Sequence, residues 1–76
     1  MLYFFDCYVD GRSATDSEGI KLEAEADPLP EALLVLAELV RDEGGAAVSV
    51  VAMNNDGDEL FTVSLVRSGR VQTLSP

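Results

Sequence analysis

The side chains that could do chemistry in this sequence are carboxylates and a single thiol. Asp and Glu number 14 against 5 Lys and Arg, and histidine is absent. Without an imidazole, Ser-His-Asp triads, Cys-His dyads and most zinc sites cannot be assembled. Acid–base catalysis by two carboxylates would need an enclosed cleft, and a chain of 76 residues has little material to build one. We therefore expect no enzyme and no catalytic, cofactor or metal site.

The thiol belongs to Cys7, which lies in an apolar segment without a neighbouring base. This setting predicts a small residue of the core rather than a nucleophile. A single cysteine excludes an intramolecular disulfide, so a reducing cytoplasm is the expected location. The opening residues 1–6 lack a basic flank and are interrupted by Asp6, and they predict neither a signal peptide nor a membrane span.

Residues 54–59, Asn-Asn-Asp-Gly-Asp-Glu, superficially resemble a calcium-binding loop. An EF-hand loop ends in a bidentate glutamate at its twelfth position, and here that position is Leu65. We interpret the segment as a hairpin turn in which Asp56-Gly57 provides the backbone geometry.

The net charge of −9 limits the kinds of partner that the chain could bind. Phosphate backbones and anionic membrane surfaces would repel the chain, so we expect neither nucleic-acid nor membrane binding. A basic protein surface would attract it.

Residues 2–9 are rich in aromatic and branched side chains and predict a strand. Alternation places Tyr3, Phe5, Cys7 and Val9 toward the core and Leu2, Phe4, Asp6 and Tyr8 on the other face. Asp10-Gly11 is a hairpin signal. After a polar stretch, residues 20–22 predict a second, short strand.

A helix is predicted from about Pro28 to Arg41 or Asp42. Asp27 is a suitable N-cap, proline is tolerated in the first turn, and Gly44-Gly45 would end the helix.

This helix is more apolar than one buried face requires. The expected buried stripe is Leu29, Leu33, Leu36, Ala37 and Val40. Leu34, Val35 and Leu39 are apolar residues of the helix that do not belong to this stripe. Either these residues pack at the sheet margin or stay singly exposed, or they form a second apolar face that meets a partner.

Residues 47–53 and 60–66 predict the remaining strands, and 67–76 form a tail that is either loose or carries an extra strand at 70–74. The whole chain, 1–76, is expected to be one domain. We predict the α+β class in the order ββαββ, with a four-stranded antiparallel sheet and one helix across one face. The open face would carry Phe4 and Tyr8. The candidate interface residues are therefore Leu34, Val35, Leu39, Phe4 and Tyr8.

Several segments occur in a distinctive order. They are Tyr3-Phe4-Phe5-Asp6, Asp10-Gly11, Asp16-Ser17-Glu18-Gly19-Ile20-Lys21-Leu22, Glu31-Ala32-Leu33 and Leu36-Ala37-Glu38-Leu39-Val40-Arg41-Asp42. This order resembles a family of short uncharacterised bacterial proteins that open with a Tyr-Phe-Phe-Asp strand and an Asp-Gly turn. The resemblance extends to about Val66. It implies a cytoplasmic bacterial protein with two hairpins and one helix, and it brings no catalytic or binding residues.

The chain departs from that family pattern in two places. Pro28 and Pro30 stand where relatives tend to have helix formers, so the helix is expected to begin later here. Leu34 and Val35 stand where relatives more often have polar or small residues. The resemblance therefore implies that the surplus apolar face is particular to this chain.

The leading functional hypothesis is a small acidic protein-interaction module, which either self-associates as a homodimer or binds a basic protein. The layout also resembles antitoxin domains of the HicB type, which neutralise a basic toxin; this is analogy from layout. A ligand-binding domain with a site formed between subunits is the other alternative. Its candidate residues would be Tyr3, Cys7, Tyr8 and the acidic loops.

Overall fold

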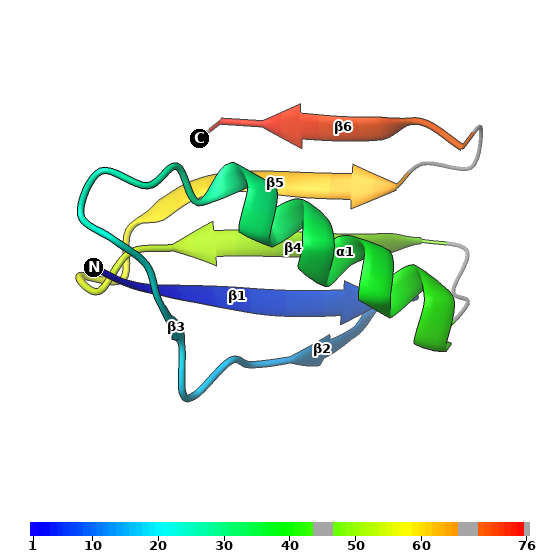
Figure 1. Cartoon of the computed structure of the whole chain (residues 1–76). Coiled ribbons are helices and arrows are strands. Elements are labelled where there is room, and N and C mark those ends of the chain that lie inside the picture. Colours follow the sequence, from blue (N-terminus) through cyan, green and yellow to red (C-terminus); the bar gives the residue numbers. More distant parts are fainter. Residues whose placement is uncertain (44–46, 66–68, 76) are drawn as a thin grey trace.

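A computed structural model of the chain shows an antiparallel sheet with a helix lying across one of its faces (Figure 1). The structure describes residues 1–43, 47–65 and 69–75, with the backbone alone at position 43. The elements are β1 (Leu2–Val9), β2 (Arg12–Ala14), β3 (Ile20–Lys21), α1 (Leu29–Glu43), β4 (Val48–Met53), β5 (Glu59–Leu65) and β6 (Val71–Leu74). The sheet order is β2-β1-β4-β5-β6, and β3 pairs with the first residues of β1.

The α+β class and the single-sided helix are confirmed, but the prediction of four strands is wrong. The described residues form six strands, and the additional ones are β2 and β6. β2 arises because Asp10 and Gly11 both have positive φ, 49° and 83°, which returns the chain directly onto β1 with Val9 opposite Arg12. The sequence pattern did not predict β2, because its residues are exposed and mostly polar.

Of the two alternatives for the tail, the structure shows the strand, since Val71–Leu74 pair with β5. Its predicted start at Arg70 is one residue too early. The predicted helix stop at Gly44-Gly45 and the predicted strand end at Val66 lie outside the described residues.

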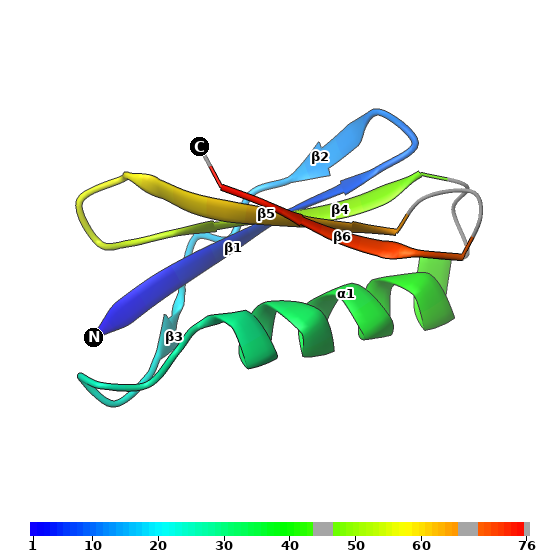
Figure 2. The same cartoon turned by 90° about the horizontal axis from the view of Figure 1, so that it is seen from above.

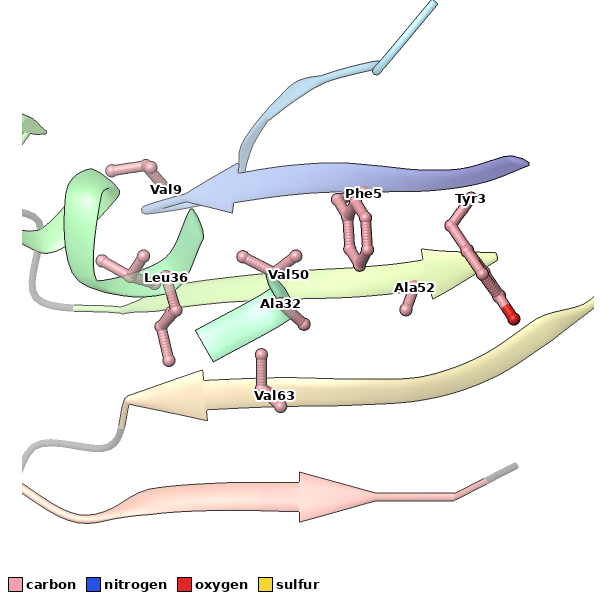
Figure 3. Close-up of a cluster of buried hydrophobic side chains, with 9 residues drawn as sticks. Tyr3, Phe5, Val9, Ala32, Leu36, Val50, Ala52 and Val63 are labelled. Atoms are coloured by element: carbon pink, nitrogen blue, oxygen red, sulfur yellow. The ribbon is translucent and has the colours of Figure 1, made fainter. Parts of the chain in front are cut away.

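Buried apolar side chains gather between the sheet and the helix (Figure 3). The cluster consists of Tyr3, Phe5, Val9, Ala32, Leu36, Val48, Val50, Ala52 and Val63. The predicted inward face of β1 is thus confirmed, with Cys7 half-buried against the cluster.

The predicted buried stripe of the helix is confirmed at Leu29, Leu36 and Val40, which are buried or half-buried against the core, and it is wrong at its other two positions. Ala32 is fully buried, and Val35 and Leu39 are half-buried against the core, whereas Leu33 and Ala37 are exposed. Apolar residues surround most of this helix, so hydrophobicity alone does not fix its orientation. The small side chain of Ala32 lies over Val50 and lets the helix approach the sheet closely (Figure 3).

The start of α1 follows from local chemistry. The backbone N–H of Leu29 donates to Asp27 Oδ1 at 3.0 Å, which satisfies one donor that the first helical turn leaves without a partner. Asp27 is therefore the N-cap, as predicted.

The helix covers one face of the sheet, and no described element covers the other (Figure 2). Along the sheet, α1 contacts β1, β4 and β5. Strand β6 lies at the edge of the sheet, outside the strands that α1 contacts (Figure 1).

Candidate functional site

An apolar hollow lies between α1 and the strands β5 and β6. It has a volume of about 420 Å³. Its lining residues are Leu33, Leu36, Ala37, Val40, Arg41, Leu65 and Val71. We call this hollow the α1–β6 groove. It forms because the helix crosses the sheet obliquely and leaves β6 uncovered (Figure 1).

Exposed apolar side chains continue the α1–β6 groove onto the molecular surface. The exposed fractions are 38% for Leu33, 59% for Leu34 and 51% for Val71. With 100° between successive helical residues, Leu33, Ala37 and Leu34 follow one another around the same side of α1. Contiguous apolar surface of this kind is typical of a protein contact.

The structure does not bring the five predicted interface residues together. Leu34 lies on the outer side of α1, whereas Phe4 and Tyr8 lie on the opposite, uncovered face of the sheet. Val35 and Leu39 are half-buried against the core, so of the two alternatives they follow packing within the fold and not a second apolar face. Leu33, which the sequence pattern placed in the core, is exposed instead and lines the α1–β6 groove.

Phe4 is half-buried by its own chain. A Cβ atom at Gly19 would lie 3.0 Å from Phe4 Cε1 and 2.9 Å from Leu2 Cδ1, so the loop before β3 packs closely on both side chains. Phe4 is therefore partly covered without a partner, which leaves Tyr8, 38% exposed, as the more accessible aromatic residue on this face.

The carboxylate of Asp16 fixes the loop between β2 and β3. Its Oδ2 accepts from the N–H of Phe5 at 3.0 Å, and its Oδ1 accepts from the N–H groups of Glu18 and Gly19 at 3.3 Å and 3.0 Å. Asp6 completes the arrangement, because its Oδ1 accepts from the N–H of Asp16 at 2.9 Å. These oxygens satisfy backbone donors, which is a structural role.

Gly19 is required at the end of that loop. Its φ is +75°, a region that L-residues seldom adopt, and an added Cβ would lie 2.9 Å from the carbonyl oxygen of Tyr3. Backbone geometry therefore explains why Gly19 follows three residues after Asp16 in this segment.

Asp10 has a second role besides forming the turn after β1. Its Oδ1 accepts from the N–H of Ala47 at 2.9 Å, and its own N–H donates to the carbonyl oxygen of Ala47 at 2.8 Å. The turn is thereby attached to the entry of β4. Sequence reasoning missed this link because the two residues are far apart along the chain.

Asn54 organises the turn between β4 and β5. Its Oδ1 accepts from the N–H groups of Asp56 and Asp58 at 2.9 Å and 3.0 Å, and Gly57 has a φ of +84°. The interpretation of this segment as a hairpin turn is confirmed. The role of Asn54 follows the known tendency of Asx side chains to bond nearby backbone N–H groups.

Cys7 has the features of an unreactive thiol. Burial, and then the negative charges of Asp16 and Asp6, raise the pKa of its thiol above the ordinary value of 9.0. The thiol donates to the carbonyl oxygen of Phe5 at 3.6 Å. Tyr3, another candidate for a site between subunits, is buried in the core. Cys7 is half-buried and lines a hollow of about 260 Å³ with Arg12 and Leu39.

Charge is unevenly distributed between the two ends of the sheet. The loop before α1, its first turn and the β4–β5 turn lie at the same end (Figures 1 and 2). Half of the 14 acidic residues occur there: Glu23, Glu25, Asp27, Glu31, Asp56, Asp58 and Glu59. We call this the acidic end. At the other end, Arg41 lies in the last turn of α1, where its Nε pairs with Asp42 Oδ1 at 3.3 Å, and Arg70 directly precedes β6.

Comparison with known proteins places the chain in a family but gives no activity. In the described residues, no helix combines the length and the apolar character needed to span a bilayer. No curated protein and no solved structure matches the chain. One family, DUF6894, matches residues 2–66, a range that includes every element except β6. The chain therefore belongs to the DUF6894 family, a domain of unknown function.

Proposed function

We propose that this domain is a self-associating protein-interaction module that docks a second copy through the α1–β6 groove. The observation that carries the proposal is the groove itself: about 420 Å³, lined by apolar side chains and Arg41, and continuous with the exposed Leu33, Leu34 and Val71.

The size of the chain supports a second copy as the occupant. A domain of 76 residues buries roughly 60% of the surface that its unfolded chain exposes, so its stability is marginal and association adds to it. The net charge of −9 would oppose self-association at the acidic end. The charge opposes self-association less at the groove, whose lining is apolar apart from Arg41. The Nε atom of Arg41 pairs with Asp42 Oδ1 at 3.3 Å.

The experiment compares two surface substitutions with matched exposure. Leu33 and Tyr8 are each 38% exposed, but they lie on opposite sides of the sheet. Absolute mass would be measured by light scattering after size exclusion, over a wide range of concentrations, for the parent, Leu33→Glu and Tyr8→Glu. We expect a dimeric parent, a dimeric Tyr8→Glu, and a Leu33→Glu variant whose dissociation constant rises at least about thirtyfold, as for an interface hot spot.

Leu34→Glu provides a second variant with little risk of unfolding, because Leu34 is 59% exposed. Val35→Glu is unsuitable, since Val35 packs against the core. A monomeric parent at every concentration would refute the proposal. A dimer that Tyr8→Glu disrupts and Leu33→Glu does not would move the interface to the uncovered face of the sheet.

A further inference from the structure

Strand β6 is an edge strand without the usual protection against pairing with another chain. It is last in the sheet order, and all four of its residues are exposed, with Leu74 at 58%. Natural edge strands are commonly protected by charged side chains, proline or a bulge. β6 consists of Val, Gln, Thr and Leu, and its pairing with β5 is regular over its whole length. Its short length is its one protective feature.

The opposite edge of the sheet is different. There β1 is paired along most of its length by two short strands, and the exposed β2 carries the charged Arg12. Of the two edges, β6 is the one that offers uncharged, exposed backbone for a further strand. It also adjoins the α1–β6 groove, because Val71 belongs to both.

We propose that two copies of this chain pair antiparallel through their β6 strands, about a two-fold axis perpendicular to the sheet. The inference rests on the proposed self-association and specifies its geometry. A two-fold interface uses the same patch on both copies, and antiparallel strands can meet in this way. Both helices then lie on the same side of one continuous sheet, and the two α1–β6 grooves face each other across the β6 pair.

Charge complementarity favours this arrangement. Arg70 stands at the start of β6, and Glu59 lines a shallow depression with Leu74 and Ser75 at its end. Antiparallel pairing brings the start of each β6 beside the end of the other. Arg70 of each copy therefore approaches Glu59 of the second copy, twice by symmetry.

The most direct test is a disulfide across the two-fold axis. A two-fold axis perpendicular to the sheet leaves every side chain on its own face, so one residue of β6 lies directly opposite the same residue of the second copy. For pairing centred on β6, that residue is Gln72 or Thr73. Gln72→Cys and Thr73→Cys would be made in a Cys7→Ser background, with Ser13→Cys on the exposed strand β2 as the matched control. After mild oxidation we expect one of the two β6 variants to give at least about tenfold more cross-linked dimer than Ser13→Cys, since disulfides need close Cα atoms.

A charge exchange provides an independent readout without oxidation. Arg70→Glu and Glu59→Arg should each raise the dissociation constant about tenfold, because each places like charges at two symmetric sites, and the double variant should restore the parent value within about threefold. A general effect of net charge would not weaken association in Glu59→Arg, because that substitution lowers the net negative charge from −9 to −7.

The outcomes separate the two proposals. A monomeric parent refutes both. A dimer that Leu33→Glu disrupts, but with neither a β6 cross-link nor restoration in the double variant, leaves the groove as the interface and refutes the β6 pairing. A self-cross-link at position 72 or 73 together with restored affinity supports the β6 pairing, and it supports the groove as well where Leu33→Glu weakens the same dimer.

Discussion

The two edges of the sheet are built by different means. Along β1, side-chain oxygens of Asp6, Asp10 and Asp16 accept backbone N–H groups and hold the neighbouring loops in place. Along β6, the described residues show backbone pairing with β5 and four exposed side chains. The carboxylates of the first edge are thus used in structure, while the apolar side chains of the second remain available for association.

The largest expected effect comes from breaking the first edge at Gly19. Gly19→Ala forces a positive φ on an alanine and brings its Cβ within 2.9 Å of the Tyr3 carbonyl oxygen, so we expect a loss of about 2 kcal/mol or more in the free energy of unfolding. Urea denaturation of the parent and the variant would measure this loss of stability.

Gly57→Ala is the matched control for this substitution. Gly57 has a similar φ of +84°, but an added Cβ would meet nothing within 4 Å. We expect it to cost about 1 kcal/mol, the penalty of the left-handed backbone alone. Equal losses in the two variants would mean that the loop before β3 yields to the added Cβ.

A smaller effect is expected from removing the carboxylate that fixes the same loop. Asp16→Ala leaves the N–H of Phe5, Glu18 and Gly19 without their acceptor and should destabilise the fold by about 1–3 kcal/mol. Asp16→Asn retains one carbonyl oxygen as an acceptor and should therefore lose less stability than Asp16→Ala. Hydrogen exchange at the Phe5 amide should accelerate in Asp16→Ala; unchanged protection there would show that the Asp16–Phe5 bond does not hold this edge.

The smallest expected effect concerns Cys7, which lies on the strand beside these carboxylates. Because the pKa of the thiol is raised above 9.0 in the folded chain, the unfolded chain loses its proton first as pH rises. The stability associated with the neutral thiol is therefore complete below pH 9.0 and is lost as pH rises through the folded pKa. At pH 9, alkylation by iodoacetamide should be slower in the folded protein than in urea.

Asp16→Asn provides a second test of the Cys7 thiol. It removes the negative charge that is the second-largest cause of the raised pKa, while burial, the largest cause, remains. The folded variant should react somewhat faster than the folded parent. A parent thiol that reacts as fast when folded as in urea would contradict the assignment of Cys7 as shielded and unreactive.

Alternation and turn chemistry were sufficient to predict most of the secondary structure. Tyr3, Phe5 and Val9 are buried as the two-residue period of a strand requires, and Asp27 caps the helix as its type suggests. These features depend on residues close together in the chain, so their sequence signals are strong.

Features that depend on distant residues were not predicted. The helix orientation is determined by how Ala32 and Leu36 fit against the sheet, which the apolar run around them does not specify. The bond from Asp10 to Ala47 and that from Asp16 to Phe5 depend on where the folded chain brings their partners. The α1–β6 groove depends on the oblique crossing of α1, so the interface candidate Leu33 was assigned to the core.

The pairing of β1 with β4 sets the order in which the chain can fold. The pairs β4–β5 and β5–β6 join segments that are adjacent in sequence, whereas β1 pairs with β4 across the whole intervening segment, from Phe4 opposite Met53 to Val9 opposite Val48. Closing such a loop costs entropy before its contacts stabilise the chain, so non-local pairing is slow. We expect the C-terminal hairpins and α1 to form early and the docking of β1 to limit the folding rate.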